Sequence, residues 1–429
     1  MSRLIPLLLL TLALANAQAA PRYNVVDLGG SDSSAYAINS LGLVAGAEYN
    51  PSGVPQAALF HDGTITGLGT LGGASSTAYG LNAHGQLVGG STNADEMRRA
   101  FLYANGAMRD LGTLGGAEAE ARRINDAGQI VGSAANADSL WHAFLYSGGG
   151  MRDLGTLGGE ISNAFDINVH GQVAGNAAIS DAIAFHAVHA FLYAGTALQD
   201  LGTFGGTNSS AWSLNDAGHA VGYAAVTGDA ADHAFLYANG AMHDLGTLGG
   251  TYSFASGINN ADQVVGVSNI AGDGGSSGFL YSGGVMLDLN TLIDPATGWR
   301  ISDAHDINDQ QQIAANGCRA GVCRALRLDL AAAVPEPATW LMLSAGLGLL
   351  GLAARRRAAS EGDIRFKRTQ AADEAQRRRK TDWIEVHGNA ACARITLEHG
   401  AMTFVDYFVL LKTAEGWKIA NKAFHGQAA

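Results

Sequence analysis

Histidine recurs in one short phrase of the sequence, where it is followed each time by Ala and Phe. The three copies begin at His142, His189 and His233. Imidazole is a common ligand for zinc and other transition metals, so regularly placed histidines are candidate metal ligands. Equivalent positions in successive repeats lie far apart unless they line a common channel. We therefore expect each histidine to be a polar residue at a strand start, and we predict neither a metal nor a cofactor.

Aspartate recurs in the phrase Asp-Leu-Gly, at Asp27, Asp110, Asp153, Asp200 and Asp244. Two carboxylates can hydrolyse a glycosidic bond when their environments differ. Near-identical copies create near-identical environments, so hydrogen bonding of each carboxylate to a neighbouring turn is favoured. Calcium loops place acidic residues at denser, alternating positions than this phrase offers. We predict that the chain is not an enzyme.

The two phrases belong to a longer unit that occurs seven times, with degenerate copies at Gly67-Leu68-Gly69 and Asp288-Leu289-Asn290. Each unit also contains an asparagine after Ile or Leu; these are Asn39, Asn82, Asn125, Asn168, Asn215, Asn259 and Asn308. The spacing between successive asparagines is 43 to 49 residues. A repeat of this period is typical of solenoids, propellers and arrays.

Each unit has the pattern of four short strands, whose clearest copies read AFLY, MRDLGTL, TAYGLN and GQLVGGS. Asn105-Gly106 and Asn239-Gly240 are signals for tight hairpins, because both residue types tolerate positive φ. Four strands in a period of this length match one blade of a propeller. We predict an all-β, seven-bladed β-propeller over residues 22–330, with an open β-solenoid as the alternative.

The two ends of the repeat region complement each other. Residues 23–30 supply a strand of the MRDLGTL type without its AFLY partner, and residues 324–330 supply an AFLY-type strand without its own partner. Pairing these two strands would complete one blade from both ends and leave no exposed sheet edge. Cys318 and Cys323 lie in the last hairpin, where a disulfide is favoured over two free thiols if the compartment is oxidising.

The copies at His142, His189 and His233 make residues 22–330 resemble the HAF repeat of extracellular bacterial proteins. Three other units depart from the triplet, with Gln56-Ala57-Ala58, Arg99-Ala100-Phe101 and Ser277-Gly278-Phe279 in its place. The resemblance implies an extracellular repeat protein and no known activity.

Residues 1–19 contain one arginine, an apolar run and the small-residue motif Ala17-Gln18-Ala19. This order is typical of a secretory signal peptide that is removed after Ala19. An uncleaved N-terminal anchor is the alternative, although the apolar run is short for a membrane span.

A second apolar run covers residues 338–354 and predicts a transmembrane helix. The run is flanked by a short motif, Pro335, Glu336 and Pro337, and by a basic cluster, Arg355, Arg356 and Arg357. Such a cluster after an apolar run stays in the cytoplasm. The three elements of residues 334–357 resemble the PEP-CTERM sorting signal, which implies processing by an exosortase and release or re-anchoring of the exported part. That signal normally ends a chain, whereas this sequence continues to Ala429.

Charge is distributed unevenly along the 429 residues, whose formal net charge is −12. The first lysine is Lys367, whereas residues 355–380 are rich in arginine and lysine. Nucleic-acid binding requires a basic surface, so the acidic repeat region predicts no nucleic-acid partner. The change near residue 355 marks a junction between two different segments.

Residues 360–429 have the pattern of three or four antiparallel strands. The segments Gly388-Asn389-Ala390-Ala391 and Gly416-Trp417-Lys418-Ile419 resemble the second half of the lumazine-binding family, whose members have an α+β cone-shaped fold of the nuclear transport factor 2 type. The resemblance implies that Asp406, Tyr407 and His425 would lie in a pocket. Helices typical of the family are largely missing, so we favour a partial fragment fused to the chain over a working ligand domain.

These features favour an exported, non-enzymatic repeat protein that acts as an interaction scaffold at the cell surface or in the extracellular matrix. Its partners would be an exosortase-type processing enzyme, the membrane through residues 338–354, and extracellular polysaccharide or surface proteins. Two alternatives stay open. One is an enzyme on exopolysaccharide, with the irregular segments 50–56 and 177–189 as functional insertions. The other is a membrane protein that binds a ligand through residues 360–429.

Overall fold

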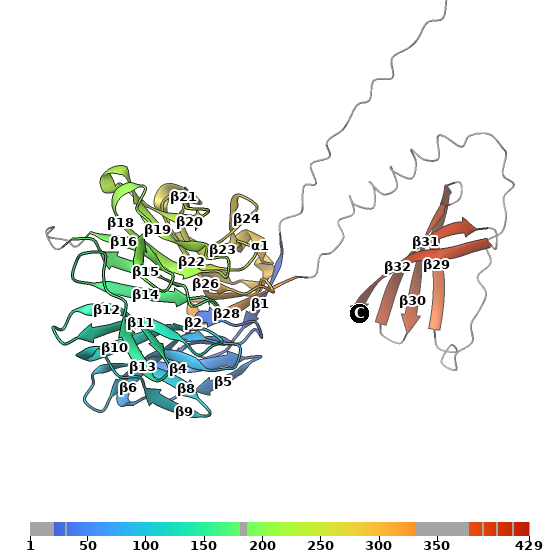
Figure 1. Ribbon diagram of the computed structural model, residues 1–429. Coiled ribbons are helices and arrows are strands. Elements are labelled where there is room, and N and C mark those ends of the chain that lie inside the picture. Colours follow the sequence, from blue (N-terminus) through green and yellow to red (C-terminus); the bar gives the residue numbers. More distant parts are fainter. Residues whose placement is uncertain are drawn as a thin grey trace, which may run out of the picture. The chain divides into compact units, whose positions relative to one another are not determined.

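The computed structural model (Figure 1) describes residues 21–30, 32–180 and 187–331, together with the backbone of four strands between residues 377 and 428. By its internal contacts the chain divides into two compact units, of which the first ends at Ala333. The predicted signal peptide and the apolar run with its flanking motifs lie outside the described residues. Among the helices that are described, none has both the length and the apolar character needed to cross a bilayer.

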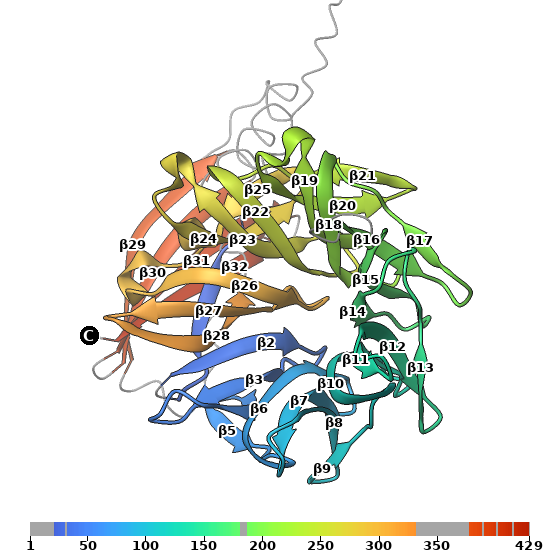
Figure 2. The same cartoon turned by 90° about the vertical axis from the view of Figure 1, so that its left-hand side faces the viewer.

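Seven four-stranded antiparallel sheets in the first unit surround a common axis as the blades of a propeller (Figure 2). Blade one consists of β2 (Ser33–Ile38), β3 (Val44–Tyr49), β4 (Pro55–His61) and β5 (Thr64–Gly67). Blade two consists of β6 (Gly72–Leu81), β7 (Leu87–Asn93), β8 (Arg98–Ala104) and β9 (Ala107–Asp110). Blade three consists of β10 (Gly115–Ile124), β11 (Ile130–Asn136), β12 (Trp141–Ser147) and β13 (Gly150–Asp153).

The next three blades repeat the same order. Blade four consists of β14 (Ser162–Ile167), β15 (Val173–Ala178), β16 (Val188–Tyr193) and β17 (Leu198–Asp200). Blade five consists of β18 (Gly205–Leu214), β19 (Ala220–Val226), the 3-10 turn η1 (Thr227–Asp229), β20 (Asp232–Ala238) and β21 (Ala241–Asp244). Blade six consists of β22 (Gly249–Ile258), β23 (Val264–Ile270), η2 (Ala271–Asp273), β24 (Ser276–Ser282) and β25 (Val285–Asp288).

Blade seven is built from both ends of the repeat region. Its strands are β26 (Arg300–Ile307), β27 (Ile313–Arg319), β28 (Val322–Leu330) and β1 (Tyr23–Asp27), and α1 (Leu289–Leu292) and η3 (Pro295–Thr297) precede it. Strand β1 pairs antiparallel with β28, from Tyr23 opposite Leu330 to Asp27 opposite Leu326. The predicted pairing of the two ends is therefore confirmed, and the ring is closed rather than an open solenoid.

The hairpin that carries the closing strand contains a covalent link. Cys318 of β27 and Cys323 of β28 are opposite each other in the register and are joined by a disulfide. The link lies next to the turn of the hairpin, so it holds β28, the strand that pairs with β1, against β27.

The strand nearest the axis in each blade has the TAYGLN pattern; these inner strands are β2, β6, β10, β14, β18, β22 and β26 (Figure 2). The AFLY strand is third and the MRDLGTL strand is outermost. A repeat unit that is read from AFLY therefore starts on the third strand of one blade and ends on the second strand of the next blade. This phase follows from closure, because the chain has to enter on an outermost strand and leave on a third strand.

The core lies between neighbouring blades. Each of the first six blades contributes one fully buried phenylalanine from its third strand; these are Phe60, Phe101, Phe144, Phe191, Phe235 and Phe279. Phe191 of blade four, for example, belongs to the same buried cluster as Val131 and Ala143 of blade three. Truncating a buried phenylalanine typically costs about 3–5 kcal/mol. The AFLY phrase is therefore the main apolar contact that holds one blade against the next.

Seven buried asparagines join the inner strands into a second, polar ring. Each Nδ2 donates a hydrogen bond to the backbone oxygen of the equivalent asparagine in the next blade. The bonds run through Asn39, Asn82, Asn125, Asn168, Asn215, Asn259 and Asn308 and back to Asn39, with Nδ2···O distances between 2.9 and 3.2 Å. The ring of bonds is complete, so no blade in it lacks a partner.

The same asparagines also form the turns after the inner strands. Oδ1 of Asn168 accepts hydrogen bonds from the N–H groups of His170 and Gln172, both at 3.0 Å. The N–H of Gly171 donates to the backbone oxygen of Asn168 at 3.0 Å. Gly171 has φ +76°, a conformation that favours glycine, which accounts for the Asn-x-x-Gly spacing in the sequence.

The second unit contains one antiparallel sheet in the simple order β29-β30-β31-β32. Its strands are β29 (Arg377–His387), β30 (Ala390–His399), β31 (Met402–Thr413) and β32 (Gly416–Ala428). The sequence predicted three or four antiparallel strands, and the structure has four. The missing family helices and the predicted pocket are not tested by these backbone strands.

We predict that Asn168→Ala lowers the free energy of unfolding by about 1–3 kcal/mol, because it leaves two turn N–H groups and one neighbouring carbonyl without their partner. Chemical denaturation followed by circular dichroism would measure the change. Val169→Ala is the matched control, since Val169 is the next residue of the same turn and is 52% exposed. Equal stability of the two variants would contradict a structural role for the asparagine ring.

Candidate functional site

The repeated histidines and aspartates pair with each other. Nδ1 of His142 lies 2.7 Å from Oδ2 of Asp153, and the equivalent pairs are His189 with Asp200 at 2.9 Å and His233 with Asp244 at 2.8 Å. The other oxygen of Asp153 accepts a hydrogen bond from the N–H of Gly155 at 2.7 Å. Each aspartate therefore links the third strand of its blade to the turn after the fourth, as predicted for a structural carboxylate.

Units that lack the histidine keep the pairing with a different side chain. Arg99 pairs with Asp110 at 2.9 Å in blade two, and Arg324 pairs with Asp27 at 2.8 Å in blade seven. Within the described ranges, no three or more His, Cys, Asp or Glu side chains are placed so that they could hold a metal ion. The histidines and aspartates that the sequence offered as candidate metal ligands or catalytic groups are thus spread around the ring and joined in pairs.

In most units, a serine six places before the ring asparagine links adjacent blades. Oγ of Ser162 in blade four donates to the backbone oxygen of Gly155 at 2.5 Å and accepts from the N–H of Ala143 at 2.9 Å. The same pair of bonds is made by Ser33, Ser76, Ser209 and Ser253. The Gly of Asp-Leu-Gly and the Ala of His-Ala-Phe therefore meet at one side chain, which explains why the phrases recur together.

Comparison of the seven units with each other separates two kinds of position on the inner strands. The residue four places before the ring asparagine is alanine in every unit and is buried. The residue three places before it differs in almost every unit: Tyr36, Tyr79, Arg122, Phe165, Trp212, Ser256 and His305. We call these seven residues the axial collar. They are partly exposed, whereas the alanine directly before each of them is buried.

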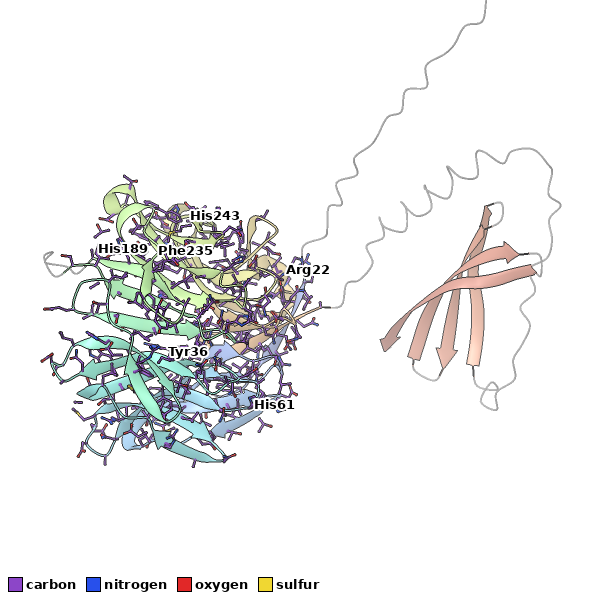
Figure 3. All side chains as sticks on the ribbon, in the orientation of Figure 1. Arg22, Tyr36, His61, His189, Phe235 and His243 are labelled. Atoms are coloured by element: carbon purple, nitrogen blue, oxygen red, sulfur yellow. A yellow bond between two sulfur atoms is a disulfide. The ribbon has the colours of Figure 1, made fainter. Side chains whose placement is uncertain are left out.

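A β-bulge sets the direction of the collar side chains. In blade one, Ala35 is opposite Gly46 and Ala37 is opposite Ala45, so Tyr36 has no partner in the ladder. A bulge of this kind re-aims the side chain of the extra residue. It also brings the backbone oxygen of Ser34 to 1.9 Å from the position that a Cβ on residue 46 would occupy, so only glycine fits there. Tyr36 is labelled in Figure 3.

A buried ion cluster lies on the axis between the collar and the asparagine ring. Arg123 of blade three is 3.4 Å from Asp166 of blade four and 3.1 Å from Asp306 of blade seven. Asp166 also accepts hydrogen bonds from Ser213 and from the N–H of Leu214 in blade five. Because blades three and seven are on different sides of the ring, the guanidinium spans its centre.

One half of the collar combines aromatic rings with charged groups. The guanidinium of Arg122 lies 4.4 Å from the ring centroid of Tyr79, and Nη2 of Arg122 is 2.7 Å from Oε2 of Glu120. Glu120 also forms an ion pair with Arg98. Tyr36 packs edge-on against Tyr79, with ring centroids 5.3 Å apart.

The charged half continues into blade seven. Tyr36 also packs edge-on against His305, again with ring centroids 5.3 Å apart. His305 Nε2 is 2.8 Å from Oδ1 of Asp303. Blades seven, one, two and three therefore present one continuous arc of aromatic and charged side chains.

The other half of the collar consists of Phe165, Trp212 and Ser256, and Trp212 belongs to an aromatic cluster. Trp212 of blade five stacks on Phe254 of blade six with ring centroids 6.0 Å apart and an interplanar angle of 16°. Tyr223 packs edge-on against both rings, at 5.3 Å from each. Edge and stacked contacts of this kind hold aromatic side chains in fixed orientations. The two halves thus differ sharply in chemistry.

Two carboxyl groups on inner strands have pKa values shifted in opposite directions. Burial raises the pKa of Asp166, although Arg123 and the hydrogen bonds from Ser213 and Leu214 oppose that effect. Burial alone would also raise the pKa of Asp303, but hydrogen bonds from His305, Ser302 and Asn316 outweigh it and lower the pKa. The two carboxylates are therefore distinguishable by titration.

Comparison with known proteins identifies the segment that follows the ring. Residues 333–357 match the PEP-CTERM protein-sorting motif. The resemblance predicted from Pro335, Glu336, Pro337 and the arginines at 355–357 is thereby confirmed. The motif implies processing by an exosortase and indicates an exported protein sorted to the cell surface.

A second family match covers the end of the chain. Residues 360–425 match the family described as "Putative lumazine-binding". The match begins upstream of the segments that carried the predicted resemblance. Asp406 and Tyr407 lie on β31, and His425 lies on β32 opposite Val405, so the backbone places the three predicted pocket residues on adjacent strands.

More distant comparisons add little. A solved structure described as "YCF48 bound to D1 peptide" is 10% identical, covers 75% of this chain and 98% of its own chain, and superposes with a TM-score of 0.45. A likeness this distant supports no inference about what this chain binds. No curated protein matches the chain. The resemblance to the HAF repeat stays a prediction.

Sequence reasoning missed the collar, because it looked for residues that recur. The available signal was the opposite one, namely the single inner-strand position that changes type from unit to unit. Of the irregular segments singled out as functional insertions, residues 50–56 form an ordered turn in which Asn50 Oδ1 accepts from the N–H groups of Ser52 and Val54. Part of the segment 177–189 lies outside the described residues.

We predict that Gly132→Ala destabilises the protein by about 1–3 kcal/mol, because the added Cβ would lie 2.0 Å from the backbone oxygen of Glu120 in the bulge. Gly150→Ala is the matched control, since a Cβ at residue 150 would meet nothing within 4 Å. Thermal unfolding of the two variants gives the comparison. A fully stable Gly132→Ala variant would show that the bulge does not require glycine.

We predict that replacing Asp166 and replacing Asp303 change the pH dependence of stability in opposite directions. Asp166 has a raised pKa, so the wild type loses stability relative to Asp166→Asn as pH rises from the ordinary aspartate pKa to the raised value. Asp303 has a lowered pKa, so the wild type loses stability relative to Asp303→Asn as pH falls from the ordinary value to the lowered one. Each slope would be at most about 1.4 kcal/mol per pH unit.

Urea unfolding of the wild type and both variants between about pH 3 and pH 7 would measure these slopes. Parallel curves for the two variants would contradict the different environments assigned to Asp166 and Asp303.

Proposed function

We propose that this chain is a non-enzymatic scaffold of the cell surface or extracellular matrix, and that the propeller is the part presented outside the cell. The observation that carries the proposal is the order of the parts. The last propeller strand ends at Leu330, and the sorting motif begins at residue 333. A sorted protein of this design exposes whatever precedes the motif, which here is the closed ring.

The contacts inside the repeats support a scaffold. The repeated histidines, aspartates, serines and asparagines are engaged with each other or with backbone groups, at positions that close turns and join blades. A catalytic pair of carboxylates requires two different environments facing a common substrate. The recurring carboxylates of Asp-Leu-Gly instead share one structural environment at the outer part of the ring.

Two further features agree with export. A disulfide between Cys318 and Cys323 suits an oxidising compartment. The repeat region contains no lysine and is acidic, which suits a soluble component among anionic polymers rather than one that binds them by charge. The arginines at 355–357 would keep the lumazine-binding-like segment on the cytoplasmic side, apart from the propeller.

We predict that the mature chain runs from about Ala20 to near Pro335 and is found at the cell surface or in the medium. Peptide mapping of cell fractions by mass spectrometry would measure its ends. Replacing Pro335, Glu336 and Pro337 with alanine should retain the chain in the membrane fraction, with peptides from β29 and from the propeller in one molecule.

Pro51→Ala is the control, because Pro51 is exposed in a turn of the propeller and lies far from the motif in the sequence. A wild-type chain that stays in the cytoplasm, or that reaches the surface equally well without the motif, would refute the proposal.

A further inference from the structure

We propose that, while the chain is anchored, the propeller is held with the face of its ring-asparagine turns toward the membrane, so that the opposite face is the surface that meets partners outside the cell. The inference rests on the proposed function, because it takes the propeller to be tethered through the segment that follows it. Its evidence is independent, since it comes from the places where the described chain enters and leaves the ring.

The two faces of the ring carry different turns. The asparagine face carries the turns that follow the inner strands and the hairpins between third and fourth strands, such as residues 61–64 of blade one. The other face, which we call the outer face, carries the turns between second and third strands, such as residues 50–54 of blade one. Because the strands of a blade alternate in direction, every third strand ends at the asparagine face.

Both ends of the propeller chain lie together on the asparagine face. β28 is the third strand of blade seven and ends there at Leu330, opposite Tyr23 at the start of β1. The N–H of Ala331 donates a hydrogen bond to the backbone oxygen of Arg22 at 2.7 Å. Arg22 and His61 lie on the same side of the propeller in Figure 3. The chain therefore enters and leaves the ring at one point of this face.

The tether that follows is short compared with a blade. The apolar run begins at residue 338, and the seven steps from residue 331 to residue 338 span at most about 25 Å when fully extended. β28 has nine residues, which correspond to about 27 Å between the outer face and the asparagine face. A tether that ran back along the blade would be used up before the outer face reached the bilayer. The asparagine face is therefore the one that the tether holds near the membrane.

The orientation is the same whichever segment anchors the chain. Ala20 and Pro21 alone separate residues 1–19 from Arg22, so an uncleaved signal segment would hold the propeller at the same point. A cut near Pro335 followed by re-anchoring would leave a tether that is shorter still.

Exposed apolar side chains supply a second observation. The three most exposed large apolar side chains among the described residues are Leu41 at 66%, Val285 at 55% and Val169 at 52%. Leu41 and Val169 lie in turns after inner strands, and Val285 begins β25 at its hairpin with β24. All three are therefore on the asparagine face. Contact with the boundary of a bilayer would remove such side chains from water, so their distribution agrees with a face turned toward lipid.

Charge does not produce this orientation. Asp126, Asp216 and Asp309 directly follow the ring asparagines of their blades, and Asp62 lies in a hairpin of the same face. Carboxylates gain nothing from anionic headgroups, which attract lysine and arginine instead. The length of the tether therefore has to hold the face, and we expect the orientation to persist in high salt, which screens exposed charges.

The outer face is then the surface that is open to the exterior. Its turns carry exposed carboxylates in blades two, three, five and six, namely Asp95, Glu96, Asp138, Asp229 and Asp273. An acidic polymer that approaches from outside would meet like charges at this surface.

Labelling of single cysteines in the full chain, inserted in phosphatidylcholine nanodiscs, tests the proposal. Blade one supplies a matched pair, since Thr64 on the asparagine face and Ser52 on the outer face are both exposed. Cys392→Ser removes the one cysteine outside the disulfide. A maleimide attached to a large polyethylene glycol should label Ser52→Cys several times faster than Thr64→Cys. The labelling rate with a small maleimide corrects each site for the reactivity of its thiol.

Two further measurements make the result specific. In blade six, Ala271→Cys on the outer face should be labelled faster than Val285→Cys on the asparagine face, by the same reasoning. A flexible Gly/Ser insertion of about thirty residues between Ala332 and Ala333 adds a mean reach of about 30 Å and should make the rates at the two faces equal. Thermal unfolding would verify that each variant is folded.

Three labelling results would overturn the inference: equal rates at the two faces, faster labelling at the asparagine face, or a difference that the long insertion leaves unchanged. A chain that separates from the nanodiscs would overturn it as well, because no tether would then hold the ring. These measurements use purified protein, so they leave the proposed function standing. A chain that stays in the cytoplasm of cells would instead refute the proposed function without changing the orientation measured in nanodiscs.

Discussion

The architecture depends on one hydrogen bond repeated around the axis, from the side-chain amide of an asparagine to the backbone oxygen of its equivalent in the next blade. Aspartate could not replace it, because a carboxylate has no N–H to donate. The bond is buried, where an unmade partner costs about 1–3 kcal/mol. The same side chain closes the turn after the inner strand, so the position of each turn and the spacing of the blades are set by a single residue type.

Once the inner strands are positioned in this way, the remaining recurrent residues act at increasing distance from the axis. Serine joins one inner strand to the third strand and the outer turn of the preceding blade. Phenylalanine fills the space between blades, and histidine or arginine pairs with aspartate at the outer edge. Each phrase of the repeat therefore corresponds to one contact that recurs from blade to blade, whereas the contacts of the collar residues differ from blade to blade.

The blade number, the strand content and the joining of β1 to β28 could be predicted, because each rests on signals local to one repeat: period, hairpin residues and incomplete ends. The axial collar could not be predicted from such signals. Tyr36 and Trp212 leave the regular ladder at a bulge that the pattern of apolar residues does not reveal. The contact between Arg123 and Asp306 joins blades that are distant in the sequence, so no spacing rule could pair them.

The ion cluster joins blades that lie on different sides of the ring. Arg123, Asp166 and Asp306 occupy the axis on the side of the collar that faces the asparagine ring, and their side chains are only 11–14% exposed. Breaking such a buried ion pair typically costs about 3–5 kcal/mol, so the cluster fixes blades three, four and seven against one another across the ring.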